Sequence, residues 1–146
     1  FSQILGGSSN SKLFRIIREK HSLCYSIYSA IYGFEHIMLI EAGIDAKNFK
    51  KTVEYTKKIF KEMEKGKFEE SDVNNYIKLY YHSLDEIYDS PNSMMNFYGS
   101  HIRRHTDMID ERKENIQKVT KEMVMKLAKK IHLDTIYLLE GDVNHE

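Results

Sequence analysis

Two histidines four residues apart are the pattern in this sequence closest to a metal site. His101 and His105 lie in the string HIRRH, which we expect to be helical, so both imidazoles would share one face of a helix. A third ligand would have to come from Asp107 or Asp110, and the two arginines between the histidines would repel a cation. Neither H-E-x-x-H nor the inverted motif H-x-x-E-H occurs in the chain. We therefore favour a solvated helix end over a metal site, with metal analysis as the deciding observation.

The single cysteine, Cys24, is a second candidate for chemistry. It lies in an alternating apolar segment with no basic residue beside it, whereas a reactive thiolate needs an accessible, electropositive environment. We therefore interpret Cys24 as a packed side chain. A single cysteine also excludes an internal disulfide framework and is typical of a reducing compartment. The cytoplasm is the expected location, and an organelle matrix is the alternative.

Composition excludes several classes of protein. Lys plus Arg and Asp plus Glu both number 22, so the net charge of zero argues against a nucleic-acid partner. No stretch of 18 apolar residues is present, which predicts no membrane span. With 146 residues, we expect a single domain over residues 1–146.

Apolar periodicity predicts the elements that must position any site. Residues 22–32 and 36–42 alternate in the manner of strands, and the short turn between them predicts an antiparallel hairpin. Residues 134–140 are expected to form a closing strand. Helical spacing is found over residues 12–21, 46–65, 70–88, 92–103, 111–118 and 121–131.

These elements together predict an α+β fold. Its sheet would be mainly antiparallel, with helices packed on one face. Three strands are few for so many helices, and the apolar pattern is already under way at Phe1. We therefore expect that the domain is truncated at its N-terminus.

Residues 5–26 carry a more specific pattern. Their string LGGSSNSKLFRIIREKHSLCYS resembles LGG-x-x-x-S-x-LF-x-x-(L/I)REK-x-x-L-x-YS of the pitrilysin and insulinase-like zinc metallopeptidases, which include mitochondrial processing peptidase. Weaker similarities continue at Gly43, at Gly66 with residues 69–72, and at Val119-Thr120. Two residues depart from the family pattern: Ser22 stands where many members have glycine, and Asp72 where glutamate is common.

The resemblance implies the second, C-terminal half of such a protein. Family members consist of two similar halves or subunits that close around a peptide, and the inverted zinc motif belongs to the other half. This chain would bind no zinc itself, would be inactive alone, and would have the zinc-bearing half or subunit and a peptide as its partners. The family pattern R-E-x-x-x-x-x-Y falls on Arg18 and Tyr25. The resemblance implies that these two side chains contact the substrate.

Two functions remain open at this stage. The first is the substrate-binding, non-zinc half of a zinc-dependent metalloendopeptidase. The alternative is a catalytically inactive homologue that acts as a regulatory or scaffolding partner of an active peptidase subunit. Both retain Arg18 and Tyr25, so the sequence does not separate them.

Overall fold

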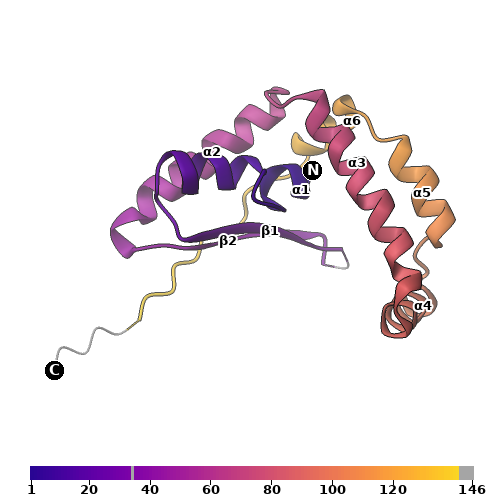
Figure 1. Cartoon of the computed structure of the whole chain (residues 1–146). Coiled ribbons are helices and arrows are strands. Elements are labelled where there is room, and N and C mark those ends of the chain that lie inside the picture. The colour runs from indigo at the N-terminus through magenta and orange to yellow at the C-terminus, as the bar shows by residue number, and fades with distance from the viewer. Residues whose placement is uncertain (34, 142–146) are drawn as a thin grey trace. The chain divides into compact units, whose positions relative to one another are not determined.

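A computed structural model describes residues 1–33 and 35–141, which divide into two compact units (Figure 1). Unit 1 comprises Phe1–Lys67 together with the segment that begins at Met125, and unit 2 comprises Phe68–Val124. The expectation of one domain over residues 1–146 stays a prediction.

An antiparallel hairpin forms the sheet of unit 1. Strand β1 (Ser26–Tyr32) pairs with β2 (Ile37–Gly43), with Ser26 opposite Gly43 and Tyr32 opposite Ile37. Alternation along β1 buries Ile27 and Ser29 and leaves Tyr28 and Tyr32 exposed. The strand predicted to begin at residue 22 begins at Ser26 because Ser22 has a positive φ of 49°, which interrupts the extended backbone.

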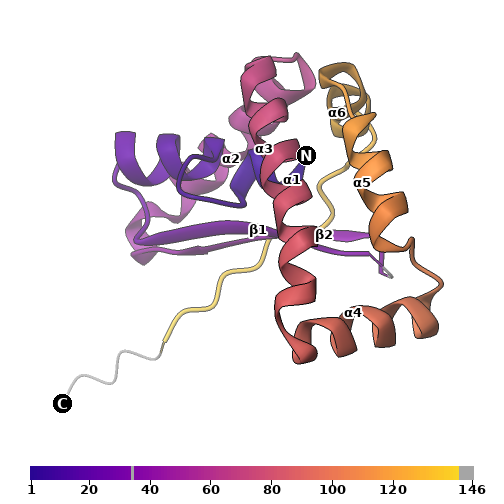
Figure 2. The same ribbon diagram turned by 45° about the vertical axis from the view of Figure 1, so that its right-hand side comes forward.

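Helices cover one face of this hairpin. Helix α1 (Ser2–Gly6) and the π-helical segment η1 (Phe14–Lys20) both contact β1. Helix α2 (Phe49–Glu64) follows the 3-10 turn η2 (Ala46–Asn48), and α1 and α2 lie on the same side of the hairpin in both views (Figures 1 and 2). The predicted α+β fold, with an antiparallel sheet and helices on one face, is thereby confirmed.

One sequence prediction for unit 1 was wrong, and one element was not predicted. Residues 134–140 form no strand in the described part of the chain, although Tyr137 and Leu139 alternate with less exposed neighbours. An alternating pattern becomes a strand only when a neighbouring strand supplies hydrogen bonds, and β1 and β2 pair only with each other among the described residues. Helix α1 was not among the predicted helices, because five residues are too few to show a helical period.

Four helices build unit 2. Helix α3 (Glu70–Asp85) runs into the 3-10 turn η3 (Glu86–Asp89) and is followed by α4 (Pro91–Arg104), α5 (Ile109–Gln117) and the first turn of α6 (Lys121–Ala128). Leu84, Phe97 and Ile109 form a buried cluster between these helices. The predicted breaks hold: the Ser90 hydroxyl caps α4 ahead of Pro91, and the Thr120 hydroxyl accepts from Met123 N–H.

Asp72 has a local role at the start of α3. Its carboxylate accepts a hydrogen bond from Glu69 N–H at 3.0 Å, which completes a reciprocal capping box. This departure from the family pattern therefore keeps the capping function that a glutamate would supply. In the described ranges, we find no helix with the length and apolar character needed to cross a bilayer.

Candidate functional site

The turn between η1 and β1 positions both predicted substrate contacts. Three backbone N–H groups fold back onto η1: His21 donates to Ile16 O at 3.2 Å, Ser22 to Arg18 O at 3.0 Å and Leu23 to Ile17 O at 3.0 Å. This pattern of helix termination requires a left-handed residue, and Ser22 supplies it with φ 49°. The site where many family members have glycine is thus a site where glycine is conformationally favoured.

Arg18 projects from the last turn of η1 into solvent. Its guanidinium carbon lies 4.6 Å from the centroid of the Phe14 ring, a distance at which a cation is attracted to the face of an aromatic ring. Neither of the ion pairs found among residues 1–33 and 35–141 involves Arg18. The Phe14 ring therefore restrains the position of the Arg18 side chain. No carboxylate among the described residues forms an ion pair with its guanidinium.

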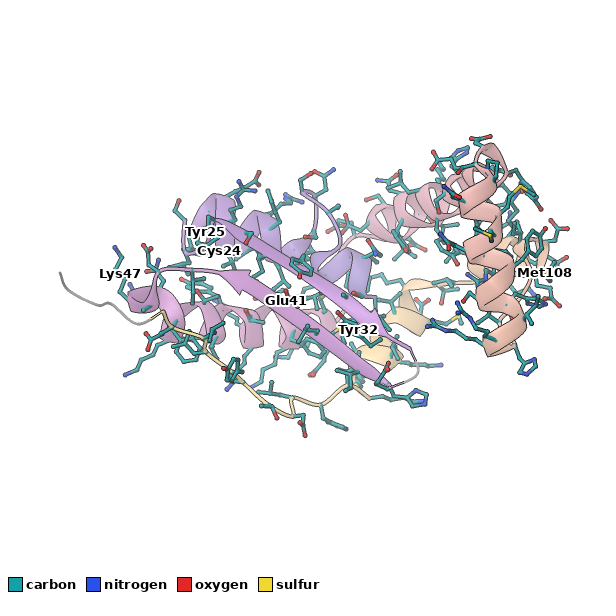
Figure 3. All side chains as sticks on the ribbon, turned by 90° about the horizontal axis from the view of Figure 1, so that it is seen from below. Cys24, Tyr25, Tyr32, Glu41, Lys47 and Met108 are labelled. Atoms are coloured by element: carbon teal, nitrogen blue, oxygen red, sulfur yellow. The ribbon has the colours of Figure 1, made fainter. Side chains whose placement is uncertain are left out.

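Tyr25 lies immediately before β1 and is fixed at its backbone. Its N–H donates to Gly43 O at 2.9 Å, and its side chain is 70% exposed. The Cε2 and Cζ atoms of the Tyr25 ring lie close to Gly43. Figure 3 shows Tyr25 and Cys24 next to each other, at the end of the hairpin opposite Tyr32. The Tyr25 phenol is thus exposed, while the backbone of Tyr25 is held by its hydrogen bond to Gly43 O.

Cys24, the residue before Tyr25, lies close enough to Arg18 for the arginine charge to affect its pKa. Burial raises the pKa of the Cys24 thiol, and the nearby positive charge of Arg18 lowers it by a smaller amount. The Arg18 guanidinium is therefore within electrostatic reach of the residue next to Tyr25. No hydrogen bond joins Arg18 to Tyr25 in the part of the chain that the structure describes, so both groups remain available to a ligand. The raised pKa and partial burial agree with our interpretation of Cys24 as a packed side chain.

The open face of the hairpin was not singled out from the sequence. Tyr28, Tyr32, Ile37 and Leu39 all lie on it and are exposed, and the Tyr28 hydroxyl donates to the Glu41 carboxylate. That hydrogen bond, followed by desolvation, raises the pKa of the Tyr28 phenol. The sequence signal was present in the alternation, but one alternating strand does not say which face helices will cover.

The histidine pair does not gain a third ligand in the structure. His101 Nδ1 contacts the Thr106 carbonyl, and His105 ends α4 in a left-handed conformation with φ 49°. Among residues 1–33 and 35–141 there is no group of three or more His, Cys, Asp or Glu side chains arranged to hold a metal ion. The helix-end interpretation of His101 and His105 stays a prediction.

Comparison with known proteins identifies relatives over most of the chain. Residues 1–80 match the family model for the peptidase M16 inactive domain. A Bacillus subtilis (strain 168) protein, described as the probable inactive metalloprotease YmfF, is 34% identical over 142 residues, which cover 97% of this chain and 33% of the relative.

Two crystal structures have the same fold. A conserved protein from Enterococcus faecalis V583 is similar with a TM-score of 0.78 at 24% identity, over 88% of this chain and 31% of that one. A protease from Helicobacter pylori gives a TM-score of 0.74 at 12% identity, over 88% of this chain and 32% of that one. The chain thus spans about a third of the length of each of these three proteins. The family resemblance found in residues 5–26 is confirmed: the chain belongs to the peptidase M16 family, and its residues 1–80 match the inactive domain of that family.

Proposed function

We propose that this chain is a C-terminal, non-zinc half-domain that holds a peptide for an M16-type metalloendopeptidase. The observation that carries the proposal is the placement of Arg18 and Tyr25. The exposed guanidinium of Arg18 and the exposed phenol of Tyr25 lie at the two ends of a single hydrogen-bonded turn. Burial raises the pKa of Cys24, the residue next to Tyr25, and the positive charge of Arg18 lowers it by a smaller amount. Residues 1–146 would act as one domain, and the cytoplasm is its proposed location.

Arg18 and Tyr25 offer chemistry that suits an amide substrate. A guanidinium and a phenol O–H are both donors, and donors aimed at a carbonyl oxygen stabilise the negative charge that develops on it. Phe14 restrains the guanidinium and Gly43 O anchors the Tyr25 backbone, so part of the ordering cost of binding is already met in the free protein. We expect these donors to complete a site only when the half-domain closes on its partner.

The hairpin offers an extended peptide a place to bind. In the described part of the chain, β1 and β2 pair only with each other, so each strand has one edge without a hydrogen-bonded neighbour. An extended segment can add to such an edge through backbone hydrogen bonds. We propose that the peptide lies along an edge near Tyr25, where β1 begins.

Zinc, where the full-length protein carries it, belongs in the other half. When bound, it would supply a water or hydroxide nucleophile at neutral pH. The described residues of this chain offer no ligand group for it, so we assign no zinc-dependent step to them. The zinc-bearing half or a partner subunit is accordingly the proposed partner.

A non-catalytic role is the second candidate function. It is favoured by the matched family model, which is that of an inactive domain, and by the Bacillus subtilis relative, which is described as probably inactive. In this case the chain would act as a regulatory or scaffolding partner of an active peptidase subunit.

Peptidase assays of the full-length parent protein test the two candidates. Wild type, Arg18→Ala and Tyr25→Phe would be compared with and without a chelator, with Arg15→Ala and Tyr32→Phe as controls on the same elements. Chelator-sensitive cleavage that falls about 100-fold in the two site variants, the scale of losing one oxyanion donor, supports the peptidase half. Absence of cleavage after zinc loading supports the non-catalytic partner.

A further inference from the structure

We infer that Gly43 is a positioning residue that sets the direction of the Tyr25 ring. Gly43 and Tyr25 contact each other in two ways, through a backbone hydrogen bond and through the Tyr25 ring. Tyr25 N–H donates to Gly43 O at 2.9 Å, and the Tyr25 ring occupies the space in which a side chain at position 43 would lie. This inference rests on the proposed role of Tyr25 as a peptide contact.

While the Tyr25 ring keeps its place, position 43 has no room for a side chain. A Cβ atom added to Gly43 would lie 2.1 Å from Tyr25 Cε2 and 2.4 Å from Tyr25 Cζ, far inside the separation of non-bonded carbon atoms. Ser26 Oγ would also lie 2.8 Å away. Alanine at position 43 would therefore force the Tyr25 ring to leave its place.

Backbone conformation does not explain the glycine. Gly43 is the last residue of β2, and Gly66 is the glycine that has a positive φ among the described residues. Because the backbone of Gly43 suits any residue, its missing side chain matters through space alone. Gly33, in the turn of the same hairpin, provides the contrast: a Cβ atom there would meet nothing within 4 Å.

The consequence concerns the direction of the phenol. The Tyr25 side chain is 70% exposed, and an exposed tyrosine with no neighbour would sample several rotamers. Contact with Gly43 favours the rotamer seen in the structure, which lowers the ordering cost when the hydroxyl meets a peptide. Displacing the ring would misplace this donor while the backbone hydrogen bond to Gly43 O survives.

The contact itself can be tested directly by NMR. In wild-type full-length protein, we expect nuclear Overhauser effects between the Tyr25 ring protons and the Gly43 Hα protons. Their absence would overturn the inference, whatever the peptide assays show.

Peptide affinity then tests the positioning role. We would measure the Kd of a fluorescein-labelled, unstructured 15-residue peptide for wild type, Gly43→Ala, Gly33→Ala, Tyr25→Ala and the double variant Gly43→Ala/Tyr25→Ala. We expect Gly43→Ala to weaken binding by about tenfold or more, since small displacements of a binding group are costly. Gly33→Ala should leave Kd unchanged, and in the Tyr25→Ala background Gly43→Ala should have no further effect.

The double variant also separates positioning from misfolding. If Gly43→Ala lowers the thermal midpoint, removal of the Tyr25 ring should restore most of it. The two shortest contacts are with that ring, and the hydroxyl of the exposed Ser26, at 2.8 Å, can rotate away. An equal loss of affinity from Gly43→Ala in both backgrounds would overturn the inference. If Tyr25→Ala leaves Kd unchanged, the proposed function of Tyr25 fails and the positioning role fails with it, even when the NMR contact is present.

Discussion

The hydroxyl groups of Ser2 and Ser29 lie 2.9 Å apart and are buried, which joins α1 to β1. Ser29 Oγ also donates to the Ser2 carbonyl at 2.7 Å, so the Ser2 hydroxyl must be the donor between the two side chains. Each hydroxyl thus has a defined part in one buried polar cluster.

Ser29→Ala should destabilise unit 1. The change leaves the Ser2 hydroxyl and carbonyl without this partner, and we expect a loss of about 1–3 kcal/mol in the free energy of unfolding. Urea unfolding of the 146-residue chain would measure it. Ser26→Ala, on the exposed side of the same strand, should change stability by less than about 0.5 kcal/mol. Equal effects of the two variants would contradict the buried cluster.

Ser22→Gly should stabilise the protein. A left-handed residue other than glycine costs about 1–2 kcal/mol, and the extra flexibility of unfolded glycine offsets about 0.5–1 kcal/mol of the relief. We therefore expect a net gain of about 0.5–1 kcal/mol for this residue at φ 49°. Denaturant midpoints would show the gain, and Ser26→Gly in the extended strand should lose stability instead. A loss at Ser22 would argue against the left-handed conformation of the η1–β1 turn.

Alkylation of Cys24 should report the position of Arg18. Burial raises the pKa of the thiol and the Arg18 charge lowers it, so Arg18→Ala should raise the pKa of Cys24 further and reduce its thiolate fraction. We expect alkylation by iodoacetamide at neutral pH to slow by about twofold, because the higher intrinsic nucleophilicity offsets part of the loss. Arg15→Ala, which removes an exposed cation from the same helix, should leave the rate unchanged. Identical rates in all three proteins would place the Arg18 guanidinium away from Cys24.

The Tyr28 and Glu41 pair should be visible in alkaline titrations. The hydrogen bond to Glu41 is the main cause that raises the pKa of Tyr28 above its ordinary value of 10.0, so Glu41→Gln should lower that pKa. Because the folded-state pKa is raised, the pair stabilises the fold at pH below the unfolded pKa, and this contribution is lost as pH rises through the folded pKa. NMR titration of the Tyr28 ring would measure the change, with Glu35→Gln as a control. An unchanged Tyr28 titration in Glu41→Gln would show that the bond is not formed in solution.

Zinc should not bind stoichiometrically to this chain. His101 already contacts the Thr106 carbonyl, and the described residues supply no third ligand. We expect that a chelator leaves the thermal midpoint unchanged. His101→Ala should lower the free energy of unfolding by about 1 kcal/mol, because the hydrogen bond to the Thr106 carbonyl is lost. Elemental analysis checks the metal content. One equivalent of zinc that disappears when both His101 and His105 are changed would reinstate the metal site.

Local signals predicted most of the fold. The hairpin followed from alternation, and the starts of α4 and α6 lie close to the predicted ranges 92–103 and 121–131. Both features depend on residues close in sequence, such as the capping residues Ser90 and Thr120. The strand at residues 134–140 was predicted wrongly because a strand depends on partners elsewhere, which its own pattern does not reveal. For the same reason the sequence could not foretell that the Tyr25 ring would cover Gly43.

The candidate site was predicted only in part. Arg18 and Tyr25 came from the family pattern, since nothing in their spacing alone indicates a site. Their exposure, the ring of Phe14 beneath the guanidinium and the left-handed Ser22 between them emerged only in three dimensions. These features depend on how η1 ends against β1.

The π-helical winding of η1 determines how the loss of one residue would affect Arg18. Along Phe14–Lys20 the backbone forms a wider coil than an α-helix, and such segments behave as if one residue had been inserted. Deleting one residue between Ser11 and Arg18 would let this segment wind as an α-helix and leave the direction of Arg18 nearly unchanged. The same deletion in an ordinary α-helix would turn every later residue by about 100°, the angle per residue. The wider coil therefore makes η1 a segment in which the loss of one residue should leave both Arg18 and Tyr25 in place.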